Sequence, residues 1–409
     1  MRYVIIGNSA AAVGAVEGIR QIDQKGEITI LTDEPHHVYS RPLLSYYLMG
    51  KATAEKMKYR SDGFYDENGC TLLCNAHATQ IEPSQKTVVL ASGDCLSYDK
   101  LLVATGSSAL IPPFDGLDTV ESMNTFMSMN DALRLERALG GHERVLIVGA
   151  GLIGLKCAEG IAKRVSSITV VDLAPRILSS ILDEEGAKRV QTHLEDKGIG
   201  FRLSCGIKRF NGNTAITQDD ETMAFDVLVL AVGVRPNTHL LKGIAEIDKG
   251  IVVNGKSETS IPDIYAAGDC TQTVDVSSGQ EKIMALLPNA YMQGECAGIN
   301  MAGGERTFDR AIPMNAIGFF GLPILTAGNT GGDVIATSRE NYYKRFYCGE
   351  NRLKGYILIG NIEKAGIYTS LIRERTPLDS IDFALICEER GLMAFTKEDR
   401  RIKLGGSLK

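Results

Sequence analysis

The chain contains one local pattern twice. Residues 4–19 read VIIGNSAAAVGAVEGI, and residues 146–161 read LIVGAGLIGLKCAEGI. Each copy runs from an apolar strand through a turn of small residues into a helix, and a second apolar run follows, ITIL at 28–31 and ITVV at 168–171. Each second run ends next to an acid. This order is typical of a parallel α/β unit that binds a dinucleotide, so the repeat constrains the fold more than any other feature.

The second copy carries the complete glycine pattern in Gly149, Gly151 and Gly154. The first glycine allows a tight turn, the second lets the backbone approach a pyrophosphate, and the third lets the helix pack closely on the strand. The start of the helix presents N–H groups and a partial positive charge to the phosphates. Asp172 ends the second strand, where a carboxylate binds ribose hydroxyls and repels a 2′-phosphate. We therefore predict an NAD(H) site that favours NADH over NADPH, although Arg176 is near.

The first copy is degenerate. Gly7 is retained, but Ser9 and Ala12 replace the other two glycines. By itself this turn would suit an ordinary strand–helix connection equally well. Its alignment with the second copy favours a second dinucleotide site, with Asp33 as the ribose-binding acid and Glu34 as the competing one.

Three further apolar strands end in small residues. They are SYDKLLVATGSSALIPPFDG (97–116), which contains Ala104, Thr105 and Gly106; FDVLVLAVGVRPNTHLL (225–241), which contains Gly233; and TSIPDIYAAGDC (259–270), which contains Gly268 and Asp269. Together with the repeat, this set resembles the pyridine nucleotide-disulfide oxidoreductases. These flavoproteins bind two dinucleotides and include glutathione reductase, NADH oxidases, rubredoxin reductase and ferredoxin reductases. The resemblance covers about residues 1–310.

The resemblance implies an α/β fold of the glutathione reductase type. It implies a discontinuous, Rossmann-like FAD-binding domain built from residues 1–112 and 244–310, with a Rossmann-like NAD-binding domain inserted at 113–243. Residues 311–409 would then form a small α+β C-terminal interface domain. Within that region, residues 353–372 predict a strand, a turn and a helix, and NYYKRFY (341–347) predicts an edge strand with a solvated face rather than a docking site.

The resemblance also implies roles for matched residues. Gly7, Ser9 and Ala12 would line the FAD pyrophosphate, Asp33 would bind its adenosine ribose, Ala78 would contact adenine through its backbone, and Asp269 would bind the ribityl–pyrophosphate region. For Asp269 the alternative is a plain turn aspartate after Gly268. The helix expected within residues 285–303, which contains Pro288, would begin facing the flavin.

The segment YSRPLLSYYLMGK (39–51) separates branches of the family. Branches that reduce disulfides or peroxides carry a redox cysteine here, whereas this chain has Pro42 and no cysteine before residue 70. Thiol chemistry needs a thiolate, so those activities are disfavoured. The Arg-Pro pair resembles ferredoxin and rubredoxin reductases and the nitrite reductase flavoprotein, which would place Arg41 near the flavin. The alternative is a surface arginine before a helix.

One pair of positions departs from the ferredoxin reductase pattern. There a lysine after Arg-Pro pairs with a glutamate after the NAD glycines, but this chain has Tyr46 and Lys156 instead. Lysine at this place is similar to the nitrite reductase flavoprotein region. It is also similar to the FAD subunits of phenylglyoxylate dehydrogenase and tungsten aldehyde oxidoreductase. We expect Arg41, Pro42 and Lys156 to lie at the reacting end of the site.

Composition limits the partners and the compartment. The net charge of −6 gives no basic surplus, so nucleic acid and anionic membranes are disfavoured. No apolar run reaches about 18 residues, so no transmembrane helix is expected. The nine cysteines are dispersed and the six histidines show no metal spacing, which indicates a reducing cytoplasm and no metal site. Cys70 and Cys74 form either a redox or metal pair or, more simply, two small loop residues.

The functional prediction is an enzyme that holds FAD and NAD(H) without a redox cysteine. Hydride would pass from NADH to the flavin, and electrons would then go singly to rubredoxin, a ferredoxin-like protein or an iron–sulfur subunit of a larger complex, or flow in reverse. One alternative is a flavin NADH oxidase that reduces oxygen. Another is a redox-sensing or assembly flavoprotein without turnover. The acceptor, the direction of flow and the oligomeric state stay open.

Overall fold

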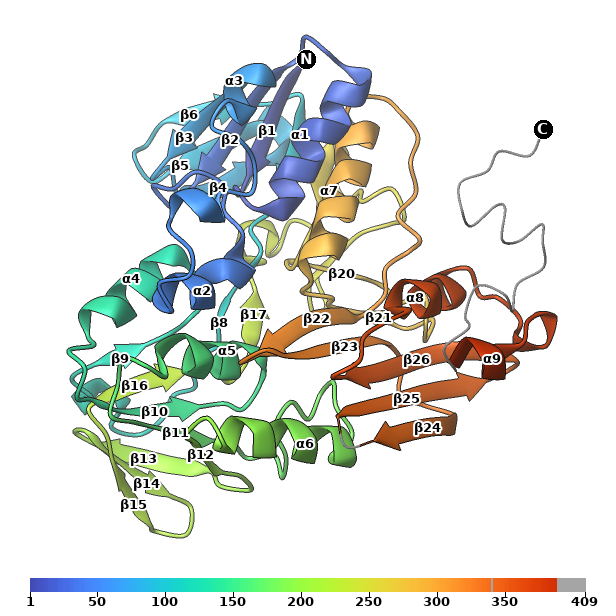
Figure 1. Cartoon of the computed structure of the whole chain (residues 1–409). Helices are drawn as coiled ribbons and strands as arrows, with labels where there is room; N and C mark the ends of the chain where they lie inside the picture. Colours follow the sequence, from blue (N-terminus) through green and yellow to red (C-terminus); the bar gives the residue numbers. More distant parts are fainter. Residues whose placement is uncertain (340, 388–409) are drawn as a thin grey trace. The chain divides into compact units, whose positions relative to one another are not determined.

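The computed structural model describes residues 1–339 and 341–387 (Figure 1). Contacts divide the chain into two compact units. The first unit contains residues 1–274 and 281–311, and the second contains residues 275–280 together with the chain from 312 on. The three domain boundaries expected from the sequence stay predictions.

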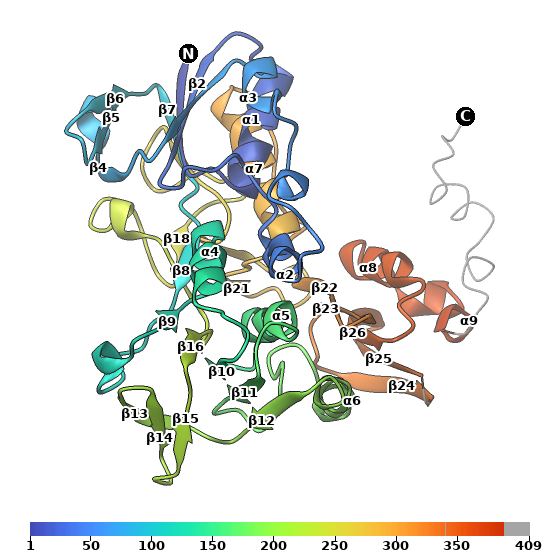
Figure 2. The same cartoon turned by 60° about the vertical axis from the view of Figure 1, so that its left-hand side comes forward.

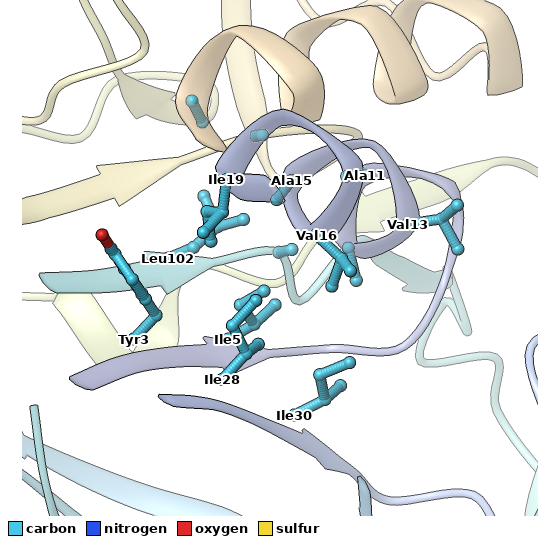
Figure 3. Close-up of a cluster of buried hydrophobic side chains, with 14 of the residues drawn as sticks. Tyr3, Ile5, Ala11, Val13, Ala15, Val16, Ile19, Ile28, Ile30 and Leu102 are labelled. Carbon is cyan, nitrogen blue, oxygen red and sulfur yellow. The ribbon is translucent and has the colours of Figure 1, made fainter. Parts of the chain in front are cut away.

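The first copy of the repeat builds a parallel five-stranded sheet in the order β19-β7-β1-β2-β3. The strands are β1 (Arg2–Ile6), β2 (Glu27–Thr32), β3 (Cys70–Cys74), β7 (Lys100–Val103) and β19 (Ile264–Ala266). Helix α1 (Ala10–Ile22) connects β1 to β2. Its apolar face packs on Ile5, Ile28 and Leu102, which point toward it from three neighbouring strands (Figure 3). Strand β19 therefore belongs to the same sheet as β1, although the second copy of the repeat lies between them in the sequence.

The second copy builds the same kind of sheet in the order β12-β11-β10-β16-β9, again parallel throughout. Its strands are β9 (Met123–Asn124), β10 (Arg144–Val148), β11 (Ser167–Val171), β12 (Ile199–Arg202) and β16 (Val227–Leu230). Helix α5 (Leu152–Ile161) connects β10 to β11, and α6 (Glu184–Glu195) connects β11 to β12. Helix α4 (Met129–Arg137) precedes β10 and begins at a capping box between Ser128 and Asp131.

The repeat extends further than its sequence similarity. After β3, the strands β4 (Ala78–Glu82), β5 (Thr87–Leu90) and β6 (Cys95–Ser97) form an antiparallel meander. After β12, the strands β13 (Ile207–Asn211), β14 (Thr214–Thr217) and β15 (Thr222–Ala224) do the same. Each meander leads back to the strand beside the first strand of its copy, β7 or β16. Two Rossmann-like segments therefore share one strand order, which confirms the predicted α/β fold class.

The remaining elements of the first unit are short connections and one long helix. Strands β8 (Ser107–Ala109) and β17 (Val234–Pro236) pair with each other, as do β18 (Ile251–Val252), β20 (Thr271–Val274) and β21 (Glu281–Lys282). Helices α2 (Leu44–Leu48), α3 (Phe64–Glu67) and α7 (Leu287–Met301) complete the unit with the 3₁₀ turns η1 (Arg41–Leu43), η2 (Glu55–Met57), η3 (Pro83–Gln85), η4 (Leu117–Thr119) and η5 (His239–Leu241). The helix expected within residues 285–303 is thus confirmed as α7.

Helices α1 and α7 cross so closely that their backbones are in contact, and both views of the chain show them side by side (Figures 1 and 2). A Cβ added at Gly294 would lie 2.0 Å from the carbonyl oxygen of Ala11, and one at Gly298 would lie 2.1 Å from that of Ala15. In the opposite direction, Cβ atoms at Gly14 and Gly18 would lie 2.2 and 2.4 Å from carbonyl oxygens of α7. Only glycine fits at these four positions, because backbone cannot yield as a flexible side chain does.

The second unit is an antiparallel sheet with helices, as expected for an α+β segment. Its strand order is β22-β23-β26-β25-β24, and the strands are β22 (Met314–Phe319), β23 (Leu322–Gly328), β24 (Asp333–Arg339), β25 (Tyr342–Gly349) and β26 (Arg352–Ile359). Helix α8 (Ala365–Arg373), turn η6 (Leu378–Ser380) and α9 (Phe383–Cys387) follow. The strand, turn and helix predicted for residues 353–372 are confirmed.

The prediction of an edge strand at 341–347 is wrong. Strand β25 lies between β26 and β24, and Tyr343, Phe346 and Tyr347 are buried. The edge strands of this sheet are β22 and β24, and all residues of β24 are exposed. The basic residues of this strand suggested a solvated face. Instead, Lys344 and Arg345 contact the aromatic rings of Tyr342 and Tyr347 within the same strand.

The crossing of α1 and α7 should not tolerate an added side chain. Gly294→Ala should lower the free energy of unfolding of the first unit by about 1–3 kcal/mol, because the new methyl group overlaps the Ala11 carbonyl. The matched control is Gly366→Ala in α8, where a Cβ would meet no atom within 4 Å. That change should be neutral or stabilise by up to about 1 kcal/mol through helix propensity. Thermal unfolding of both variants checks this. Equal effects would mean that the crossing tolerates a side chain.

Candidate functional site

The first glycine of each motif makes the same contacts in both copies. Gly7 has φ +119° and Gly149 has φ +116°, a region that favours glycine. A Cβ at Gly7 would lie 2.1 Å from the carbonyl oxygen of Ala104, and one at Gly149 would lie 2.2 Å from that of Ala231. The amide of Gly7 also donates to the Leu31 carbonyl, as the amide of Gly149 does to the Val171 carbonyl, both at 2.8 Å. The carboxyl ends of three strands therefore meet at each glycine.

The second position of each motif is open. Gly151 has extended backbone angles, and a Cβ there would meet no atom within 4 Å. Ser9 has similar angles, φ −129° and ψ −162°, so a side chain fits without strain. Ser9 is the N-cap of α1, but its hydroxyl accepts no capping hydrogen bond. The first-turn N–H groups at both helix starts thus face space that suits a pyrophosphate, which is the fit expected for FAD and NAD(H).

The third position explains why the copies differ. A Cβ at Gly154 would lie 2.0 Å from the carbonyl oxygen of Gly149, so α5 sits too close to its turn for any side chain. The matching Ala12 is buried with its methyl group accommodated. The first turn therefore accommodates a methyl group at this position, which the second turn excludes.

The acid of the second copy is fixed by backbone donors. The carboxylate of Asp172 accepts from the amide of Ala150 at 2.6 Å and from the amide of Ala174 at 2.8 Å. These bonds hold it beside the glycine turn. Arg176 instead donates to the carbonyls of Leu182 and Ser179, at 3.3 and 3.4 Å. The arginine nearest to Asp172 in the sequence is thus engaged by backbone carbonyls, which supports the expected preference for a free 2′-hydroxyl.

The two acids of the first copy have different surroundings. Asp33 is 66% exposed and contacts the His77 ring nitrogen at 3.0 Å. Glu34 is 20% exposed and accepts from Arg41 at 2.8 Å and from the Tyr39 hydroxyl at 2.6 Å. The competing acid is therefore occupied by protein groups, whereas Asp33 stays accessible, so the structure favours Asp33 as the ribose ligand. Ala78, the expected adenine contact, begins β4 and is buried directly after His77.

Arg41 is neither isolated nor an ordinary surface arginine. Besides its ion pair with Glu34, it donates to the Met127 carbonyl at 2.8 Å, and its guanidinium lies 5.4 Å from the ring centroid of Tyr39. The Tyr39 hydroxyl accepts from the amide of Met129, the first residue of α4. Arg41 therefore connects η1, in the first copy of the repeat, to the residues at the start of α4. Pro42, beside it, is exposed at the start of η1.

Asp269 lies where α1, α7 and the sheet meet. Burial raises its pKa above the ordinary value, while the hydrogen bond from Ser107 at 3.2 Å and the charge of Arg41 act in the opposite direction. A Cβ at Gly268 would lie 3.2 Å from the Ala11 side chain and 3.5 Å from that of Ala290, so Gly268 sits between the starts of both helices. Pro288 occupies the first turn of α7 and is exposed.

Hydrogen bonds connect the residues that follow β7 with those that follow β16 and β17. The Thr105 hydroxyl donates to the Asn237 carbonyl at 2.6 Å, and the Asn237 amide group donates to the Thr105 carbonyl at 2.9 Å. The backbone amide of Asn237 donates to the Gly106 carbonyl, at 2.9 Å. Both Gly106 and Gly233 have positive φ, +65° and +124°. The structure thus brings the small residues predicted from separate strands into one junction.

Tyr46 and Lys156, which replace the expected lysine and glutamate, also come together. The ammonium of Lys156 lies 4.9 Å from the ring centroid of Tyr46 and pairs with the carboxylate of Glu159. Helix α2 carries Tyr46, and α5 carries Lys156. A Cβ at Gly160 would lie 3.2 Å from the carbonyl oxygen of Ser45, so these helices touch through backbone. Figures 1 and 2 show α2 next to α5.

The thiols form no pair. All nine cysteines are free; Cys74 and Cys95 are exposed, and Cys157 and Cys270 are buried. Burial raises the pKa of the Cys157 thiol far above its usual range and that of Cys270 to about 11. Among residues 1–339 and 341–387, no group of three His, Cys, Asp or Glu side chains could hold a metal ion. Within the same residues, no helix is long and apolar enough to cross a membrane.

Several residues that shape the site gave no signal in the sequence. Asn8 accepts from the Tyr65 hydroxyl at 2.9 Å and so fixes the first turn. Gln293 of α7 accepts from the amide of Gly268 at 2.9 Å, which fixes α7 against the Asp269 loop. Glu159 appears in the repeat, where it aligns with Glu17, and that alignment was the only available hint of its importance.

Comparison with known proteins agrees with this geometry. The family model described as pyridine nucleotide-disulphide oxidoreductase matches residues 1–294. The NADH-dependent phenylglyoxylate dehydrogenase subunit epsilon of Aromatoleum evansii is 31% identical over 391 residues, which cover 92% of each chain. The rubredoxin-NAD(+) reductase of Pseudomonas putida is 31% identical over 313 residues, which cover 74% of this chain and 80% of that protein.

A solved structure shares the fold. The covalent putidaredoxin reductase–putidaredoxin complex matches with a TM-score of 0.87 at 24% identity, covering 95% of this chain and 96% of the matched chain. The expected resemblance and the cofactors FAD and NAD(H) are thereby confirmed. The chain belongs to the pyridine nucleotide-disulphide oxidoreductase family.

Proposed function

We propose that the chain is an FAD-dependent oxidoreductase that transfers electrons between NADH and an external iron–sulfur or rubredoxin-type carrier, or an iron–sulfur subunit of a larger complex. The observation that carries this proposal is the junction of α2 and α5. It brings α2, which follows the Arg-Pro pair, against the helix that follows the NAD glycines. By the resemblance to the family, Pro42 would stand where the branches that reduce disulfides or peroxides have a redox cysteine. Electrons would thus leave from the flavin itself.

Each segment of the chain has a distinct task in this proposal. Bound FAD supplies the chemistry that links two-electron transfer with NADH to one-electron transfer with a carrier. Gly7, Ser9 and the first turn of α1 would hold its pyrophosphate, and Asp269 its ribityl region. Arg41, held by Glu34 and Met127, would fix a positive charge near the flavin. Gly151 and Asp172 would hold NADH.

The choice of acceptor is supported by the two relatives. One is named as a subunit of an NADH-dependent dehydrogenase and the other as a rubredoxin reductase. Both names fit an enzyme that exchanges electrons with another protein. The nine free cysteines fit a reducing compartment, so we place the protein in the cytoplasm.

Anaerobic mixing with NADH tests the function. NADH should rapidly bleach the visible flavin absorption of the purified protein, and a rubredoxin or a ferredoxin should then restore it faster than oxygen does. Steady-state rates with each acceptor give the comparison. Faster reaction with oxygen would identify an NADH oxidase. Absence of bleaching would identify a sensor or assembly protein.

Asp172 should select NADH. Asp172→Ala should weaken NADH binding by about 1–2 kcal/mol, the worth of charge-assisted hydrogen bonds to the ribose. The matched control is Asp226→Ala. Asp226 also accepts a hydrogen bond from a backbone amide, that of Arg144 at 2.8 Å. However, Asp226 precedes β16 and lies at the amino ends of the strands, whereas Asp172 lies at their carboxyl ends. That variant should lose stability and keep its affinity. Equal use of NADPH by the wild type would contradict this role of Asp172.

The absence of a redox cysteine should appear in titration and alkylation. Reduction should need about one equivalent of NADH per FAD, because no disulfide or sulfenic acid takes up a second electron pair. Alkylation should modify Cys74 and Cys95 first, since they are exposed, and should leave NADH-to-dye activity largely intact. A small artificial acceptor must be used, because alkylation could disturb a docking surface. Loss of dye reduction with FAD still bound would make one of the thiols catalytic.

A further inference from the structure

Three side chains form a compact charged cluster where α2 meets α5. The side chain of Glu159 is 5% exposed, and the side chain of Lys156, one helical turn earlier, is 17% exposed. The ammonium of Lys156 lies over the ring of Tyr46, 4.9 Å from its centroid. A carboxylate this deeply buried is costly unless a cation accompanies it. We refer to Tyr46, Lys156 and Glu159 as the junction cluster.

The first copy of the repeat offers an internal comparison. Glu17 aligns with Glu159, and it also binds a cation, Arg60 at 2.7 Å, and in addition accepts from the hydroxyl of Tyr291. There the cation comes from a distant segment, so the ion pair ties α1 to that segment. In the second copy the cation belongs to α5 itself. The ion pair between Lys156 and Glu159 lies within one helix, and the same ammonium packs on the Tyr46 ring, so a positive charge is held where α5 meets α2.

A dinucleotide bound in the second copy would extend its nicotinamide end toward this charge. Asp172 lies beyond β11 and would bind the adenosine ribose, while the start of α5 would bind the pyrophosphate. The nicotinamide half would then extend away from Asp172 toward the elements of the first copy of the repeat. Among these elements, α2 is a helix that contacts α5. This step rests on the proposed function, in which NADH meets the flavin at this junction.

We propose that Lys156 discriminates between the two oxidation states of the nucleotide. The nicotinamide ring is neutral in NADH and carries a positive charge in NAD⁺. An ammonium held near it disfavours the cationic ring, so the junction cluster promotes NADH binding and NAD⁺ release. Tyr46 and Glu159 are positioning residues for this charge, and the carboxylate of Glu159 partly offsets it.

The test measures binding and requires no turnover. The oxidised holoprotein is titrated with NAD⁺ and with tetrahydro-NAD, a neutral analogue that cannot donate hydride, and the ratio of the two Kd values is recorded. The wild type should bind the neutral nucleotide more tightly. Lys156→Met should reduce this preference by about fivefold, the size of a Coulomb interaction of unit charges about 4 Å apart at the dielectric constant of water. Lys156→Arg should retain the preference, because the positive charge remains.

Two glutamate variants complete the design. Glu159→Gln should increase the preference, because it removes the offsetting negative charge. Glu17→Gln, its counterpart in the other copy, should lower stability and leave the ratio unchanged. An unchanged ratio in Lys156→Met, or a reduced preference in Glu159→Gln, would overturn the inference. Failure of the wild type to bind either nucleotide would contradict the proposed function as well. Normal binding without reduction of any carrier would contradict the proposed function alone.

Discussion

The site depends on a contact of backbone with backbone that occurs once in each copy of the repeat. At Gly7 and at Gly149 the turn passes so close to the exit of a neighbouring strand that a Cβ would overlap its carbonyl oxygen. This approach fixes the start of the following helix over the carboxyl ends of the strands. Phosphate binding at such a place needs no charged side chain, because the helix N-terminus supplies oriented N–H groups. The rest of the site is added around these two turns.

The sequences of the two copies differ at the motif positions where the backbone leaves room for a side chain. The second motif position is open in both copies, so a serine is accepted there without strain. The third position excludes a Cβ in the second copy, whereas the first copy holds a buried alanine there. The aligned glutamates diverged in their partners while both kept a cation. A repeat that looks damaged in sequence can therefore remain intact in geometry.

The sequence predicts what backbone periodicity and glycine placement determine. It predicts both sheets, α7 and the small residues at the strand ends, since these features depend on local patterns. It does not predict the partners of Arg41, because Glu34, Tyr39 and Met127 are brought to it only by the tertiary fold. The meanders repeat without sequence similarity. The basic residues of β25 suggest an edge strand, but they pack on tyrosines of the same strand, which lies inside the sheet. Such features follow from contacts that no single segment contains.

The junction shows how a weak local element acquires a fixed place. Helix α2 has only five residues, too few to be stable by helix propensity. Glu136 of α4 accepts from the Tyr47 hydroxyl of α2 at 2.9 Å and from Arg164 at 3.0 Å, and Arg164 also donates to the Leu48 carbonyl at 3.3 Å. These bonds and the close approach at Gly160 tie α2 to α4 and α5. The Arg-Pro segment leads directly into α2, so the residues expected beside the flavin and those expected beside the nicotinamide share one set of helix contacts. A change in the α2–α5 packing would therefore move both groups at once.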